Sequence, residues 1–376
     1  MFTNIQGEEV MKKYQNTLKL MGSLSNLFSE SSSPYLGYRA VENIFCKVFN
    51  AENLSRSDCS ADASKDKIGI GIKTFLNGNG KTLQKIAEFN SDLELYRDKN
   101  PKEIIKTVSR LRNERLEATK RIHGLEQLIY HCVVRDVERI MVFECPMDKI
   151  DVDKIKNIKI KEHVLSFEDN KNEYSFNMSK STLYKRFITK NIILDFKVNI
   201  IEDPYIYLEN ILLENCSEKL IFAPIKQHPH IYLPLFSDKG VRNVPERSGL
   251  NQWNARGRAR DYNEVYIPIP SLIHKKFPGF FPPRDISFNL KLPNGKNMSA
   301  KVCQDGSKAL MSNPNKELGE WILREVMRLK EGELLTYNKL QELGLDSVVI
   351  YKLDDNNFTI DFTAIGSYDE FVDQNK

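Results

Sequence analysis

The chain has 376 residues, of which 41% are hydrophobic and 10% aromatic, so it can bury a sizeable core, and its length favours two domains over one. Its net charge of +4 is too small to require a polyanionic partner, so the position of the charges matters more than their sum. The six cysteines lack C-x-x-C spacing, no signal-peptide core opens the chain, and no apolar run is long enough to span a membrane. We therefore expect a reduced, cytoplasmic protein with no membrane segment.

The first part of the chain mixes helical and strand-like patterns. Apolar residues at helical spacing predict helices at 8–28, 38–49, 82–90 and, as one or two helices, 101–134. Alternating and apolar runs predict strands at 68–75, 139–145, 163–169 and 172–178. This order of elements predicts an α/β domain over residues 1–215.

The rest of the chain has a different character. Residues 216–246 contain prolines and polar residues with little periodicity, so we expect a linker there. From 247 to 376 the pattern is mostly β, with strands expected at 265–270 and 297–303 and one helix at 318–329. A second, mainly-β domain follows.

Charged residues in the first domain suggest metal-dependent hydrolysis of a phosphodiester. That reaction needs carboxylates to hold a hard cation and a lysine to orient the attacking water. The predicted strand GIGIKTF carries Lys73, Asp62 lies upstream of it, and Glu42 is available from the preceding helix. The usual nuclease pattern, Asp followed by Asp/Glu-x-Lys, would place an acid at position 71, where this chain has Gly71.

This pattern resembles the PD-(D/E)XK nuclease superfamily, some members of which move the missing carboxylate to the following helix. Here QKIAE offers Glu88, with Gln84 one turn earlier. The resemblance implies that Asp62 and Glu88 bind Mg²⁺ and that Lys73 positions water. The second candidates at this site are Glu42, Asp58 and Gln84. Alternatively, the aspartates belong to a solvated Ser/Asp/Lys-rich loop and Lys73 is an ordinary exposed lysine.

Three other motifs carry weaker signals. Residues 179–187 combine lysines, an arginine and hydroxyls that suit phosphate oxygens, but they equally fit the capped start of an amphipathic helix. The pair His228 and His230 is more typical of a loop than of a zinc site, because no cysteine lies nearby. Cys59 has no triad partners, so nucleophilic catalysis there is not expected.

The stretch SGLNQWNARGRARDYNEVYIPIP, residues 248–270, is the most distinctive in the chain. Arginine can fork onto guanine, Asn and Gln onto adenine, and flanking basic groups onto phosphates. A second polar loop at 303–315 follows a predicted strand. Two arms on one β domain predict a clamp on duplex DNA, although each could be an ordinary surface loop. The candidate DNA-binding residues are Arg247, Asn251, Gln252, Trp253, Asn254, Arg256, Arg258, Arg260, Gln304, Asp305, Ser307, Lys308, Asn313 and Asn315.

The segments RSGLNQWNARGRARDYNEVYIPIP, KVCQDGSKALMSNPNKELG and FTIDF resemble the C-terminal DNA-binding domain of NgoFVII-type restriction endonucleases. That domain is similar to the plant B-three pseudobarrel, an open seven-stranded barrel whose N-arm and C-arm grip the major groove. The resemblance implies an N-arm at 248–264 and a C-arm at 304–315. Relatives often carry a phospholipase-D-type nuclease domain, marked by His-x-Lys followed four residues later by Asp. The His-x-Lys here, at His274, lacks that Asp and lies in the second domain.

These observations predict a type II restriction endonuclease that makes sequence-specific, Mg²⁺-dependent double-strand cuts. Its expected fold is a PD-(D/E)XK-like mixed sheet with helices, joined to a B-three-like pseudobarrel at 247–376. Cutting both strands favours a homodimer. Two alternatives remain open: a DNA-binding regulator whose first domain only dimerises, and a nuclease that responds to base modification.

Overall fold

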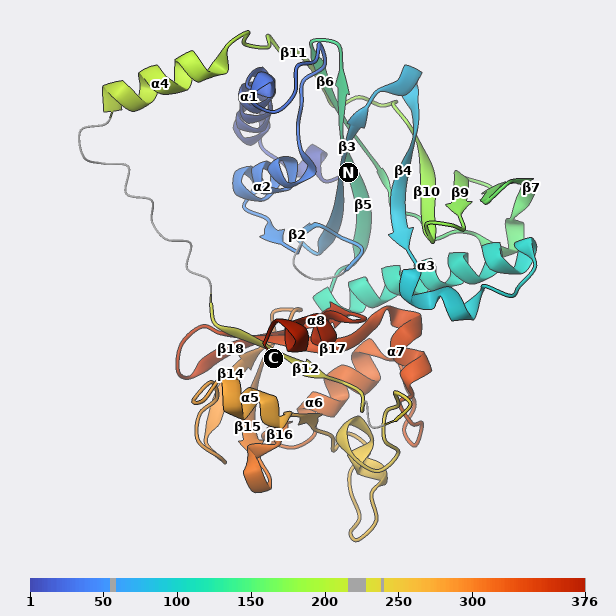
Figure 1. Ribbon diagram of the computed structural model, residues 1–376, viewed down its shortest axis with the longest axis vertical. Helices are drawn as coiled ribbons and strands as arrows, with labels where there is room; N and C mark the ends of the chain where they lie inside the picture. The colour runs from blue at the N-terminus through green and yellow to red at the C-terminus, as the bar shows by residue number, and fades with distance from the viewer. Residues whose placement is uncertain (55–58, 216–227, 238–239, 376) are drawn as a thin grey trace. The chain divides into compact units, whose positions relative to one another are not determined.

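The computed structural model describes residues 1–54, 59–215, 228–237 and 240–375 (Figure 1). The chain divides into two compact units. The first comprises Met1–Asn90, Tyr96–Arg110 and Glu126–Lys226, and the second Ser91–Leu95, Leu111–Leu125 and Gln227–Lys376. No helix in these described ranges is both long and apolar enough to cross a membrane. Asp58, a second candidate at the catalytic site, lies outside the described residues.

A six-stranded mixed sheet forms the centre of the first unit, in the order β1-β2-β3-β5-β6-β11. Its strands are β1 (Glu52–Asn53), β2 (Ala63–Lys65), β3 (Ile68–Leu76), β5 (Gln127–Asp136), β6 (Arg139–Pro146) and β11 (Leu194–Lys197). The pair β3 and β5 is parallel, whereas the other neighbours are antiparallel. A parallel pair needs a long crossover, which here contains a strand and the helix α3 (Pro101–His123).

Two helices, α1 (Glu8–Ser23) and α2 (Tyr38–Phe49), pack on one face of this sheet (Figure 1). In α2 the buried positions recur at helical spacing, so a single apolar face meets the strands. The helix ends at Asn50, whose left-handed φ of 51° closes the last turn. The predicted helix at 38–49 is therefore confirmed, and it carries Glu42 on a rigid element.

A second, five-stranded antiparallel sheet has the order β4-β10-β9-β8-β7. Its strands are β4 (Lys81–Glu88), β7 (Lys156–Lys161), β8 (Val164–Glu168), β9 (Glu173–Asn177) and β10 (Thr182–Ile188). The helix predicted at 82–90 is thus wrong. Burial in β4 alternates from Lys81 to Ile86, with Thr82, Gln84 and Ile86 half-buried, which is the period of a strand; Ala87, beside a register shift, is half-buried too.

Two other predictions about the first unit need correction. The helix expected through residue 134 ends at His123, because Gly124 adopts a left-handed φ of 64° and the following apolar run forms β5. Residues 128–134 are buried throughout, as in a strand covered on both faces. The motif at 179–187 lies largely in strand β10, where Lys185 is buried, and is not the start of a helix.

The second unit is built on a seven-stranded sheet in the order β12-β17-β18-β14-β15-β16-β13. The first and last strands of this order also contact each other, so the sheet is nearly closed into a barrel. The strands are β12 (His230–Pro234), β13 (Ile267–Pro268), β14 (Ser287–Lys291), β15 (Asn297–Cys303), β16 (Ala309–Ser312), β17 (Leu345–Lys352) and β18 (Asn357–Ala364). The predicted mainly-β architecture is therefore observed.

Helices accompany this barrel. They are α5 (Ser271–Lys276), α6 (Glu317–Gly319) with a π-helical continuation at Glu320–Val326, α7 (Tyr337–Leu343) and α8 (Ser367–Gln374). The predicted helix at 318–329 is thus shorter and partly π-helical. The expected linker at 216–246 contains β12, because Ile231 and Leu233 are fully buried in the barrel core.

Candidate functional site

Glu42, Asp62 and Lys73 come together around the hairpin of β2 and β3. Glu42 lies on α2 and is only 4% exposed. Asp62 immediately precedes β2, and its Oδ2 accepts a hydrogen bond from the backbone N–H of Ile72 at 2.6 Å. Lys73 is the next residue of β3. The carboxylate is therefore fixed to the strand one residue from the lysine.

The pKa shifts show that these groups act on one another. Burial raises the pKa of Asp62, while the charge of Lys73 and the hydrogen bond from Ile72 lower it in part. Burial likewise raises the pKa of Glu42, and the nearby Asp62 carboxylate raises it further, against the charges of Arg39 and Lys73. Two carboxylates and two cationic side chains are thus close enough for their charges to influence one another.

Gly71 stands where the usual nuclease pattern has an acid, and its surroundings explain the glycine. A Cβ at this position would lie 2.6 Å from the Met147 methyl carbon and 3.1 Å from the ring of Tyr130. A side chain there would require the flexible end of Met147 to move away and the Tyr130 ring to shift by a few tenths of an ångström. The position is therefore filled by apolar neighbours, which makes a carboxylate there sterically unfavourable.

Glu88 and Gln84 lie on opposite faces of β4. Glu88 is exposed and forms an ion pair with Lys85 at 2.8 Å. Gln84 pairs in register with the buried Lys185, so it points to the inner face, where its Nε2 donates to the Thr82 hydroxyl at 3.0 Å. Because the expected helix is a strand, Glu88 does not approach from the predicted direction. Glu88 is not among the groups whose charges shift the pKa of Glu42 or Asp62.

The donor set at this site suits a hard divalent cation. Among the described residues, no hydrogen bond ends at Glu42 Oε1 or Asp62 Oδ1, while their other oxygens bind Arg39 and Ile72. Magnesium is commonly held by one or two carboxylates, with water and substrate phosphate completing its shell. In the described part of the chain, no group of three or more His, Cys, Asp or Glu side chains that could hold a metal ion is found.

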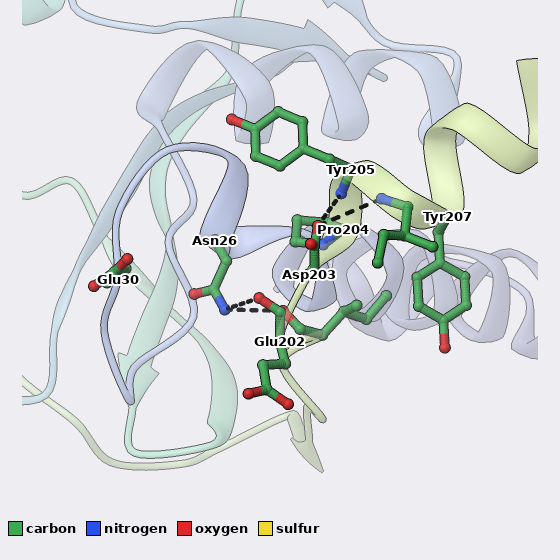
Figure 2. Close-up of a pocket in the computed structure, with 9 residues that line it drawn as sticks. Asn26, Glu30, Glu202, Asp203, Pro204, Tyr205 and Tyr207 are labelled. Atoms are coloured by element: carbon green, nitrogen blue, oxygen red, sulfur yellow. Dashed lines mark hydrogen bonds between the residues drawn. The ribbon is translucent and has the colours of Figure 1, made fainter.

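A separate hollow in the first unit is lined by acidic and uncharged side chains (Figure 2). It lies beside the start of α4 (Pro204–Asn215), where the Asn26 amide donates to the carbonyl oxygens of Ile201 and Glu202 at 2.9 and 3.1 Å. Asp203 Oδ1 accepts the N–H of Tyr205 at 3.0 Å and so caps the helix. The lining includes acids and no lysine or arginine, so it does not suit a polyanion.

The N-arm, residues 248–264, begins with the short 3₁₀ helix Gly249–Asn254. Asn251 is fully buried, and its amide both donates to and accepts from the backbone of Leu335, each at 2.9 Å. The sequence predicts that Asn251 contacts bases, but in the folded arm its amide is hydrogen-bonded to the Leu335 backbone. Asn251 therefore anchors the arm, and its predicted place in a groove needs correction.

The other predicted DNA-binding residues of the N-arm differ in how exposed their side chains are. Trp253 is half-buried against the barrel core and lies 5.4 Å from the ring of Tyr262. Arg260 is held in the loop by the carbonyl oxygen of Ala255 at 2.8 Å, and Arg258 pairs with Glu264. Predicted residues that remain exposed on this arm are Asn254, Arg256 and Arg258, and Arg247 just before the arm is also exposed.

The base of the N-arm is fixed by residues that sequence reasoning missed. Lys316 forms an ion pair with Asp261 at 2.7 Å, and Arg324 donates to the Asn263 side chain and to the Tyr262 carbonyl oxygen, both at 2.8 Å. Gly319 permits this approach, because a Cβ there would lie 2.0 Å from the Asn263 carbonyl oxygen. A glycine inside a predicted helix was the available signal of close packing.

The C-arm, residues 304–315, is the connection between β15 and β16 and the residues that follow it. Asp305 at its tip pairs with Arg284 at 3.3 Å, and the Ser307 carbonyl oxygen lies 3.0 Å from the His274 ring nitrogen. Asn313 donates to the Ser287 hydroxyl of β14 at 3.1 Å. Lys308, Asn313 and Asn315 are exposed, while Gln304 and Ser307 are half-buried, as is Gln252 of the N-arm. In Figure 1 the yellow segment after β12 and the orange end of β15 and β16 both extend to the lower end of this unit.

The second unit is a nearly closed barrel with two polar loops, and this architecture agrees with a B3-like pseudobarrel. Residues 225–354 match the family described as the NgoFVII C-terminal B3-like DNA-binding domain. The match begins before β12, earlier than the boundary expected at residue 247, and it does not extend into residues 1–215. Comparison with curated proteins finds no match to the chain.

Proposed function

We propose that this protein is a type II restriction endonuclease, with a Mg²⁺-dependent, PD-(D/E)XK-like nuclease in its first unit and site selection in its B3-like domain. One observation carries the proposal. The fold gathers Glu42, Asp62 and Lys73 from a helix, a loop and a strand, although the three are separated in sequence. Acids in a partly buried setting beside a lysine are the groups that phosphodiester hydrolysis requires.

The chain's own residues have distinct roles in this proposal. Glu42 and Asp62 hold the cation, and the N–H of Ile72 keeps the Asp62 carboxylate oriented. Lys73 orients a water molecule for in-line attack on phosphorus. Bound Mg²⁺ supplies Lewis-acid stabilisation of the charge that develops on phosphate and leaving oxygens.

Recognition is assigned to the two arms. Their exposed basic and amide groups, among them Arg256, Lys308 and Asn315, suit phosphates and base edges. Because cleavage of both strands generally needs two active sites, we include a homodimer or DNA-induced pairing in the proposal.

The deciding experiment incubates the purified protein with large genomic DNA, either natural or amplified in vitro so that it carries no modified bases. We expect discrete fragments with Mg²⁺, none with EDTA, and a shared sequence at the fragment ends. Specific binding without cleavage of either DNA would favour the regulator. Cleavage confined to the natural, modified DNA would favour the modification-dependent nuclease.

A further inference from the structure

We infer that Arg39 contacts the scissile phosphate of the DNA and serves as a further catalytic residue of the first unit. This inference rests on the proposed nuclease function and deepens it. Arg39 is in the first turn of α2, one helical turn before Glu42.

The geometry of the pair places a cation at the mouth of the site. Arg39 Nη1 lies 3.0 Å from Glu42 Oε2, yet the Arg39 side chain is 58% exposed while that of Glu42 is 6% exposed. The guanidinium also lies 5.2 Å from the centre of the Tyr38 ring, which holds it by a cation–π contact. The arginine therefore extends from a buried carboxylate to the surface.

The charges around Arg39 match a phosphate that approaches from solvent. Among the described residues, Asp62 and Glu42 supply two acidic groups here and Lys73 and Arg39 two basic ones, so acids and bases are equal in number. Bound Mg²⁺ would leave this group of residues positive. A guanidinium has five N–H donors in a planar fork, a geometry that suits a phosphate oxygen as well as a carboxylate.

An exposed ion pair that has no catalytic role would respond differently to the loss of its arginine. Such pairs contribute little to stability, and their loss leaves remote functions unchanged. Arg139 offers a control for the loss of an exposed arginine in the same unit: it also pairs with an acid, Asp195, and its side chain is 45% exposed, but Asp195 is 41% exposed whereas Glu42 is 6% exposed. Arg139 lies on strand β6, outside the group around Glu42.

The test uses full-length Arg39→Ala, Arg39→Lys, Lys73→Ala and Arg139→Ala. Single-turnover cleavage of amplified DNA is measured at saturating Mg²⁺, together with DNA affinity in EDTA and the melting temperature. We expect Arg39→Ala to slow cleavage by about 100-fold with unchanged DNA affinity, because it removes a preorganised donor at the developing charge. Arg39→Lys should recover part of the rate, since it restores the charge without the fork.

The outcomes separate the inference from the proposed function. Wild-type cleavage by Arg39→Ala with an inactive Lys73→Ala would overturn the role of Arg39 alone. Wild-type cleavage by both variants would overturn the active site, and no cleavage by the unaltered protein would overturn both. If Arg39→Ala does not fold, Arg39→Lys decides: a slower rate at an unchanged melting temperature supports the contact, and a wild-type rate contradicts it. Cleavage by Arg139→Ala as slow as that by Arg39→Ala would also contradict it.

Discussion

The two polar regions of this protein are built in opposite ways. Around Glu42 and Asp62 the charged groups are buried or partly buried and held by a helix and a strand hairpin. On the N-arm the charged groups, such as Arg256, are exposed on a loop. The buried Asn251 amide and the contact of Arg324 with Asn263 hold the base of this loop. Hydrolysis requires reacting groups that are held in a fixed geometry. Contacting bases in a DNA groove requires side chains that extend from a loop whose ends are held by the domain. The comparison predicts that the two activities can be damaged separately.

The largest effect is expected from Asp62→Asn. Asparagine keeps the size and can still accept from the Ile72 N–H through its carbonyl oxygen, but it loses the charge that holds the cation. Cleavage should fall by at least about 10²-fold, the cost of losing one preorganised electrostatic group. DNA affinity in EDTA should not change. A variant that cuts at the normal rate would remove Asp62 from the site.

Within the second unit, Arg256→Ala and Asn251→Ala should separate recognition from stability. Arg256→Ala should weaken specific binding by about 1–3 kcal/mol without changing the melting temperature, because its side chain is exposed. Asn251→Ala should reduce the free energy of unfolding by roughly 1–3 kcal/mol, because it leaves the buried Leu335 backbone unpaired. Binding titrations and thermal melts of both variants test this. The reverse pattern would contradict the division of the arm into anchor and contact residues.

The pH dependence of cleavage follows from the raised pKa values of Glu42 and Asp62. Both groups bind protons more tightly in the folded chain than in the unfolded one. Their contribution to stability is therefore present at low pH and is lost as pH rises through the raised pKa values. Cleavage should increase over that same window, because only the ionised carboxylates hold a cation. More Mg²⁺ should move the acid limb of the rate profile to lower pH, and a limb that ignores Mg²⁺ would contradict the metal site.

Glu88→Gln should have the smallest effect. Its exposed pair with Lys85 is worth under about 1 kcal/mol, and it lies on the outer face of β4. We expect cleavage and stability close to those of the unaltered protein. A loss of cleavage as large as that of Asp62→Asn would return Glu88 to the metal site.

The sequence predicted α2 because its apolar residues recur at helical spacing, and β3 because a short apolar run ends at a turn. The error at residues 82–90 has a physical origin. Leu83, Ile86 and Ala87 satisfy helical spacing, but the register with β10 shifts beside Ile86, where a bulge interrupts the alternation of the strand. A pattern of this length does not distinguish a helix from a bulged strand, so Glu88 was assigned to the wrong geometry.

At the candidate site, residue types were predictable but partners were not. Asp62 and Lys73 could be singled out by their chemistry, and the arms by their density of Arg, Asn and Gln. The contact of Arg39 with Glu42 and the burial of Asn251 depend on tertiary packing. Sequence composition reveals polarity, but it does not distinguish an amide that binds the protein backbone from one that binds a base.

The most direct test of separate cutting and binding regions is to measure DNA cleavage and specific DNA affinity for Lys73→Ala in the same preparation. The binding probe is a DNA that contains the recognition site. That site is deduced from the ends that the unaltered protein produces when it cuts DNA. We predict that the Lys73→Ala variant binds this site with unchanged affinity and does not cut it with Mg²⁺. Normal cleavage by Lys73→Ala, or loss of binding together with cleavage in a folded protein, would contradict it.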